Sequence, residues 1–189
     1  MLFSLALVGR RVAPLCLAVL VAGLSGCLTA EGTLDRDGTG TLTLAYKVPA
    51  GMTEPAVRAL LEAPGVTVES ISIAADRMVT AKLKITDLAG ISKTKLLKDA
   101  TVVQSAQGDD KTLTITYTNA SSRGAADKSL PGPKIKITLP GPVTEANEKG
   151  VVEGSTVTWS FASLADWIGH DKWELVAHYR LPDAAGTAH

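Results

Sequence analysis

The sequence has little cysteine and no excess of either charge sign. Its 189 residues include two cysteines, Cys16 and Cys27. So few thiols exclude a disulfide-rich scaffold and a zinc site built from cysteines. The 19 Lys and Arg side chains balance 19 Asp and Glu, whereas nucleic-acid-binding proteins usually carry a basic excess. We therefore expect no nucleic-acid partner.

The N-terminal segment lacks acidic residues altogether. Arg10 and Arg11 precede an apolar stretch from Val12 to Leu24. This stretch is shorter than the roughly 20 residues that span a bilayer, and no later stretch is long enough either. A basic start, a short apolar core and a small-residue end are typical of a secretory signal peptide. We therefore predict a cleaved signal peptide over residues 1–26.

The end of this segment reads Leu24-Ser25-Gly26-Cys27. It resembles the bacterial lipobox, in which signal peptidase II cuts before the cysteine and the thiol then carries diacylglycerol. The resemblance implies that Leu24, Ser25 and Gly26 are recognised by the peptidase and that Cys27 is lipidated. It also implies that the membrane is a partner through this diacylglycerol. We expect a lipid-anchored protein of the cell envelope on the non-cytoplasmic side. The membrane would be the outer membrane in a Gram-negative host, and otherwise the outer face of the cell membrane.

Beyond residue 32, apolar and polar residues alternate as they do in half-buried strands. Leu42, Leu44 and Tyr46 show this period of two. The pattern predicts hairpins over residues 33–48, 66–85 and 102–118, further strands over 135–139, 156–161 and 173–181, and helices over 53–63 and 87–98. Hairpins with few helices between them indicate an α+β fold with a mainly antiparallel β-sheet and two short helices.

The length allows one domain after the signal peptide. We expect the acylated Cys27 and a short tether over residues 27–32, and a single α+β domain over residues 33–181. Residues 119–133 contain one large apolar side chain, Leu130, and are expected to form a long loop. Residues 182–189 are small and polar, and we predict a disordered tail.

Aromatic residues gather near the C-terminus. Those after residue 158 are Trp159, Phe161, Trp167, Trp173 and Tyr179. Aromatic side chains bury the most area per residue, which favours a place in the main core, and we expect Trp159 and Trp173 to be buried on strands. The alternative is that all five line a ligand pocket for an amphiphile or a sugar.

Lysines are concentrated between residues 82 and 98, where Asp87 is the one acid. They are Lys82, Lys84, Lys93, Lys95 and Lys98. One interpretation is a solvated strand and helix face. The other is a contact of Lys82, Lys84 and Lys95 with anionic lipid headgroups, each lysine contributing about 1 kcal/mol near such a surface.

Candidate metal ligands are poorly spaced. His170, Glu174 and His178 would share one face of a helix, but residues 173–181 alternate as a strand. Along a strand Glu174 and His178 stand about 13 Å apart, at roughly 3.3 Å per residue, which is too far for one ion. The G-x-S-x-G motif is missing, although a triad assembled in space stays open. We expect no metal, no cofactor and no enzymatic activity.

One segment suggests a family. The residues that carry a resemblance are Leu139-Pro140-Gly141-Pro142-Val143, Asn147, Val157-Thr158-Trp159 and Ala177 in the last strand. Their pattern resembles the LppM-type domain of bacterial envelope lipoproteins. Two features depart from the family pattern. The Asn and the Gly that are adjacent in the family's turn are separated by other residues here, and the C-terminal transmembrane helix of some relatives has no counterpart. Pro140 and Pro142 cannot donate a backbone hydrogen bond, so a strand must end there or lie at the edge of the sheet. Gly141 between them permits a positive φ.

The resemblance implies an α+β envelope domain without catalytic residues, and a lipid or glycolipid ligand as proposed for some members. We therefore expect a non-enzymatic lipoprotein that binds a lipid, glycolipid or similar amphiphile at the membrane surface. The alternative is a structural or interaction lipoprotein that presents a surface to another envelope component and has no ligand pocket. A buried apolar pocket would favour the first function, and a large exposed apolar patch would favour the second.

Overall fold

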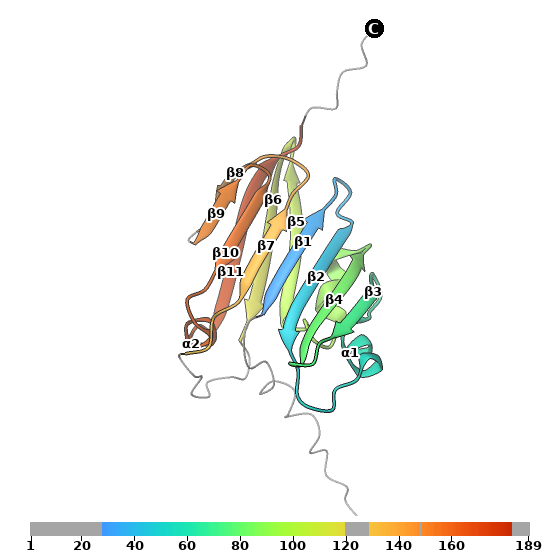
Figure 1. Ribbon diagram of the computed structural model, residues 1–189. Coiled ribbons are helices and arrows are strands. Elements are labelled where there is room, and N and C mark those ends of the chain that lie inside the picture. Colours follow the sequence, from blue (N-terminus) through green and yellow to red (C-terminus); the bar gives the residue numbers. More distant parts are fainter. Residues whose placement is uncertain (1–27, 120–128, 148, 183–189) are drawn as a thin grey trace, which may run out of the picture.

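The computed structural model describes residues 28–119, 129–147 and 149–182. Within these residues the chain forms two β-sheets (Figure 1). The larger sheet has seven strands in the order β3-β4-β2-β1-β7-β10-β9, and the smaller has four in the order β5-β6-β11-β8. The strands of the larger sheet are β1 (Thr29–Leu34), β2 (Gly40–Lys47), β3 (Val66–Ile73), β4 (Met78–Ile85), β7 (Lys134–Thr138), β9 (Gly150–Glu153) and β10 (Thr156–Ser160).

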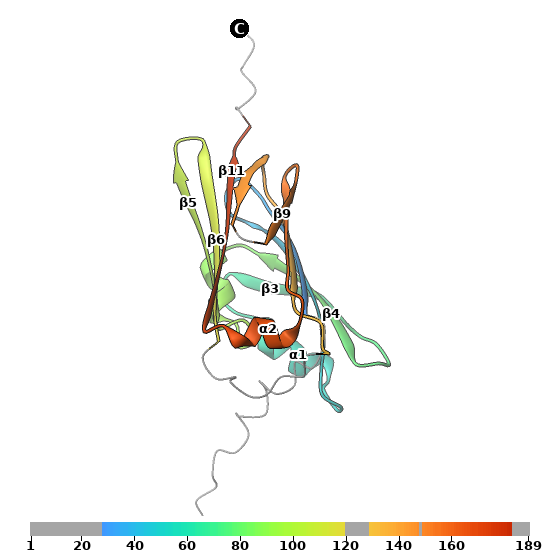
Figure 2. The same cartoon turned by 90° about the vertical axis from the view of Figure 1, so that its left-hand side faces the viewer.

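The smaller sheet consists of β5 (Ala100–Gln107), β6 (Asp110–Thr118), β8 (Val143–Ala146) and β11 (Lys172–Arg180). Figure 2 shows it facing the β1-β7-β10-β9 side of the larger sheet. Helix α1 (Glu54–Leu61) and the 3-10 helix η1 (Leu88–Lys93) cover the β2-β4-β3 side of the same face. Helix α2 (Leu164–Gly169) crosses from one sheet to the other at the lower end.

The alternation of side chains explains why each sheet buries one face. In β4, Val79, Ala81, Leu83 and Ile85 are buried, whereas the lysines between them are exposed. Successive side chains of a strand point to opposite faces, so the apolar set must turn toward a covering layer. Every strand pair is antiparallel except β1 with β7, among the described residues. The predicted α+β class with a mainly antiparallel sheet is confirmed.

The interior consists of two apolar clusters. One lies between the sheets and contains Trp159, Trp173 and Leu175. The other lies under α1 and η1 and contains Val57, Leu61 and Ile91. Leu88 and Val102 pack against both clusters. The two clusters therefore meet where the edge of the smaller sheet approaches η1.

The tether predicted over residues 27–32 is wrong for its last four residues. β1 begins at Thr29, and the Leu28 carbonyl already accepts a hydrogen bond from the Lys134 backbone N–H at 2.9 Å. The prediction placed the start at residue 33 because Glu31 and Gly32 interrupt the apolar pattern. β1 is a central strand that pairs with β2 and β7 on its two edges, and this pairing outweighs the weak local signal.

The helices differ from the prediction in the second half of the chain. Residues 87–98 were expected to be helical, but only the short η1 forms there. Helix α2 was not predicted; Ser163 caps it by accepting a hydrogen bond from the Asp166 backbone N–H. The short strands β8 and β9 were not predicted either. Most of the predicted loop over 119–133 and of the tail over 182–189 lies outside the described residues.

Candidate functional site

The five aromatic residues lie in the core, the place the sequence favoured over the alternative of a pocket lining. Their exposed fractions are 0% for Trp159, 6% for Phe161, 5% for Trp167, 6% for Trp173 and 1% for Tyr179. The expectation that Trp159 and Trp173 are buried on strands is confirmed, since they lie on β10 and β11. All five belong to the cluster between the sheets.

These five rings do not form one site. Phe161, Trp167 and Trp173 gather at the lower end of the sandwich, with ring centroids 4.5 to 5.6 Å apart. Tyr179 lies six residues further along β11, about 20 Å away at strand spacing, where its hydroxyl accepts a hydrogen bond from Gln104. Tyr117 on β6 joins the lower group instead, 5.0 Å from Trp167. Tyr117 was missed because it is far from the other aromatics in sequence.

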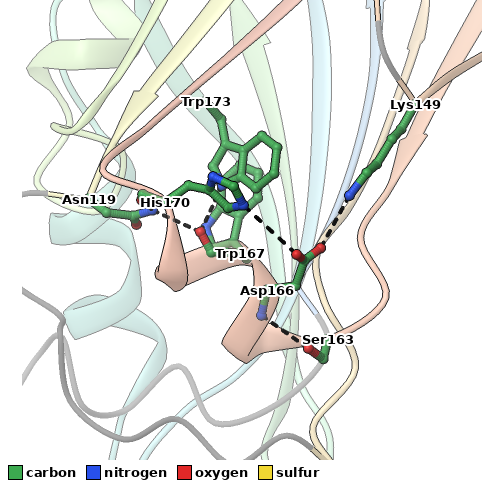
Figure 3. A network of polar contacts seen from close by, with 7 residues as sticks. All are labelled: Asn119, Lys149, Ser163, Asp166, Trp167, His170 and Trp173. Carbon is green, nitrogen blue, oxygen red and sulfur yellow. Dashed lines mark hydrogen bonds and ion pairs between the residues drawn. The ribbon is translucent and has the colours of Figure 1, made fainter.

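Helix α2 is held in place through its last turn (Figure 3). The Trp173 indole N–H donates to the Trp167 carbonyl oxygen at 2.7 Å. The Asn119 amide donates to the same oxygen at 2.9 Å and to the His170 carbonyl oxygen at 2.6 Å. The last carbonyls of a helix have no partner within the helix, so these donors fix the end of α2 against β11 and β6.

A lysine ammonium sits over the lower aromatic group (Figure 3). Lys149 Nζ lies 5.7 Å from the Phe161 ring centroid and 5.5 Å from that of Trp173. The same Nζ lies 3.3 Å from the Asp166 carboxylate, whose other oxygen lies 4.0 Å from His170 Nε2. Both distances to the rings fall within the range of cation–π attraction. Lys149 therefore makes an ion pair with Asp166 and cation–π contacts with Phe161 and Trp173 within the chain.

Six residues on the inner faces of the two sheets keep contact with solvent, although they are apolar or lack a side chain. We name them the interlayer seam: Ala30, Gly32, Leu42, Val102, Ile115 and Ile135. They lie on inner faces, because Ile115 pairs with buried Leu175 and Ile135 pairs with buried Trp159. In the larger sheet Ala30 pairs with Ile135, and in the smaller sheet Val102 pairs with Ile115.

The lysines predicted to contact headgroups do not share one surface. Lys82 and Lys84 are on the outer face of β4, opposite to the face that α1 and η1 cover. Lys95 follows η1, whose Ile91 packs on the inner face. Lys82 Nζ also lies 3.0 Å from the Glu69 carboxylate. The sequence prediction missed this split because residues 88–99 cross to the other side of the sheet.

The predicted lipidation site is outside the described residues, together with Leu24, Ser25 and Gly26. Leu28 alone separates Cys27 from β1. Within residues 28–119, 129–147 and 149–182, no helix is both long and apolar enough to cross a membrane. In the same part of the chain, no three His, Cys, Asp or Glu side chains are grouped to hold a metal ion.

Two buried polar atoms have no hydrogen-bond partner among the described residues: the Tyr46 hydroxyl and the Trp159 indole nitrogen. Tyr46 lies on β2 in the cluster under α1. Burial raises the pKa of Tyr46 to about 12, because the phenolate cannot be hydrated there.

The fold and site define a two-layer, mainly antiparallel domain with a solvent-contacting seam between its layers. The LppM domain family matches residues 29–166. The chain therefore belongs to the LppM family, and its folded part is a lipoprotein-type domain, a class that suggests a place in the cell envelope. The NMR structure of the folded domain of LppM from Mycobacterium tuberculosis is similar, with a TM-score of 0.51 at 18% identity over 86% of this chain and 93% of that one. None of the curated proteins matches the sequence.

Proposed function

We propose that this domain binds an amphiphile, with the hydrocarbon part held at the interlayer seam, and that it does so at the membrane surface without catalysing a reaction. The ligand class is a lipid, a glycolipid or a similar molecule. The family supports a lipoprotein-type domain, and the ligand is our inference from the seam.

The observation that carries this proposal is the partial exposure of Ile115 and Ile135. Each lies on a strand that has a neighbour on both edges, and each faces the opposite sheet. Inner-face residues of a closed sandwich lose contact with water, as Val157 and Ala177 do here. We infer from the contact with water at Ile115 and Ile135 that the layers are incompletely closed between them.

The partly exposed apolar side chains of the interlayer seam would contact hydrocarbon more favourably than water. Burial of apolar surface is favourable by about 25 cal/mol per Å². Leu88, Leu96 and Leu97 are also apolar and only partly buried, and they pack against the same cluster as Ala30, Leu42 and Val102. These neighbours extend the apolar lining along η1 and the chain that follows it.

The membrane anchor fits the same proposal. We propose that the signal peptide over residues 1–26 is removed and that Cys27 carries diacylglycerol on the non-cytoplasmic side. Because the Leu28 carbonyl is already hydrogen-bonded within the sheet, the folded domain would start one residue after the acylated cysteine. The lower end of the sandwich, where β1 begins (Figure 1), would then rest on the bilayer.

The proposal is tested by a larger side chain at the interlayer seam. If the proposed gap between the layers exists, Ile115→Trp should place its larger ring there, and we expect this variant to stay folded and to lose bound lipid. Val103→Trp is the matched control, since Val103 lies on β5, next to β6, and is 51% exposed. Mass spectrometry of lipids extracted with each purified variant gives the readout, and thermal unfolding checks that both are folded. Equal lipid content in both variants would reject the seam as the binding site.

The alternative of a pure interaction protein has less support. Among the described residues, the exposed large apolar side chains are Val103, Val151 and Val152. They lie on β5 and β9, which are edge strands of different sheets. A wild-type protein that carries no lipid at all would favour this alternative.

A further inference from the structure

We infer that the site formed by Phe161, Asp166 and Trp173 binds the primary ammonium headgroup of an amphiphile, and that Lys149 occupies this site when no ligand is bound. The inference rests on the proposed function, because it assigns the headgroup of the ligand whose hydrocarbon part lies at the interlayer seam. Figure 3 shows Asp166, Trp173 and Lys149 of this site.

The chemistry of the site selects a cation. Two ring faces lie within 6 Å of the Lys149 nitrogen, and a carboxylate lies 3.3 Å from it. Ring faces attract cations through their quadrupole, and the carboxylate adds a charge-assisted hydrogen bond. The carboxylate needs an N–H donor, so a primary ammonium fits better than a quaternary one.

Lys149 can leave without any backbone movement. The turn that carries it is pinned by Asn147, whose side-chain oxygen accepts from the Val176 backbone N–H at 2.9 Å and whose backbone oxygen accepts from Gly150 at 3.0 Å. The lysine side chain is about half exposed at 47% and has four rotatable bonds. A ligand ammonium therefore competes only with a flexible side chain, which rotates into solvent.

The ammonium site adjoins the interlayer seam. Trp167 stacks on Trp173 and also contacts Tyr117, 5.0 Å away. Tyr117 lies two residues beyond Ile115 on the same face of β6. Trp167 and Trp173 are buried core residues that pack between the two places, so the proposal requires the hydrocarbon chain of a headgroup at Asp166 to pass beside these rings on its way to Ile115.

The experiment compares three phospholipids with identical acyl chains. The full-length protein in an uncharged sugar detergent is incubated with phosphatidylethanolamine, phosphatidylcholine or phosphatidylglycerol, and native mass spectrometry measures the bound fraction. We expect phosphatidylethanolamine to bind about fivefold more tightly than the other two, the scale of one cation–π and ion-pair contact. Asp166→Asn should remove this preference.

Lys149→Met separates the ligand role from a structural one. Methionine keeps most of the aliphatic stem but removes the competing ammonium, so phosphatidylethanolamine should bind severalfold more tightly than to wild type. Lys172→Met is the control, because its side chain is similarly exposed, at 55% against 47% for Lys149, and pairs with Glu174 at 2.7 Å instead of Asp166. Equal binding of all three lipids to wild type and Lys149→Met would overturn the ammonium inference and leave the amphiphile proposal intact. No binding of any lipid would reject both.

Discussion

Trp167 and Trp173 stack with their ring planes 7° from parallel and their centroids 5.6 Å apart. One belongs to α2 and the other to β11. The Trp173 indole N–H also donates to the Trp167 carbonyl oxygen. This stack joins the helix that closes the lower end of the sandwich to a central strand of the smaller sheet, and Trp173 is also one of the two rings near the Lys149 ammonium.

We expect Trp173→Ala to lower the free energy of unfolding by about 3–5 kcal/mol, because it leaves a large cavity and removes the bond to Trp167. Val103→Ala, on an exposed position of β5, should change it by less than about 0.5 kcal/mol. Urea unfolding measures both. A loss below about 1 kcal/mol for Trp173→Ala would contradict its place in the core.

Gly141 should not tolerate any side chain. A Cβ atom built there would lie 1.9 Å from the Arg180 carbonyl oxygen. Gly141 does not use the positive φ that glycine permits, since the glycines with positive φ among the described residues are others. Close approach to β11 is the actual constraint. Gly141→Ala should cost about 3 kcal/mol or more, whereas Gly169→Ala, with open space around it, should be neutral. Comparable stabilities of the two variants would refute this reading of Gly141.

The fold could be predicted from the sequence more completely than the site. Alternation in residues 79–85 identifies an inner and an outer face without any structure. The Asn147 turn, Tyr117 and Lys149 could not be predicted in the same way. Their positions depend on the smaller sheet folding over β10, which brings residues distant in sequence together. The start of β1 was missed because Glu31 and Gly32 interrupt the apolar pattern, whereas pairing with β2 and β7 on both edges stabilises this strand.

Tyr46 should make stability fall at high pH. Its pKa is about 12 in the folded protein and about 10 when the chain is unfolded. Below pH 10 both states hold the proton and stability does not depend on this group. Above pH 10 the unfolded chain loses the proton first, so stability decreases by at most about 1.4 kcal/mol per pH unit until pH 12.

The Tyr46→Phe variant isolates this effect from other groups that titrate at high pH. It also removes a buried hydroxyl without a partner among the described residues, so we expect it to be as stable as wild type or more stable at pH 7. The difference between the two proteins, measured by urea unfolding from pH 9 to pH 11, should grow in favour of the variant. A constant difference would contradict the burial of the phenol.

Cys27→Ser should abolish lipidation, because the thiol is the acceptor of diacylglycerol. Metabolic labelling with a radioactive fatty acid, followed by membrane fractionation, gives the readout. We expect label in the wild-type protein and none in the variant. Cys16→Ser is the control, since Cys16 lies in the segment that would be removed. Equal label in all three proteins would exclude Cys27 as the lipidated residue.

The central claim is that hydrocarbon lies between the two sheets. Photo-crosslinking of the wild-type protein with a fatty acid that carries a mid-chain diazirine tests it most directly, since peptide mapping then locates the hydrocarbon. We predict that the label falls on the inner faces of β6 and β7, at or beside Ile115 and Ile135, and that Ile115→Trp removes it. Label confined to the exposed valines of β5 and β9, or label unchanged in Ile115→Trp, would contradict the proposed function.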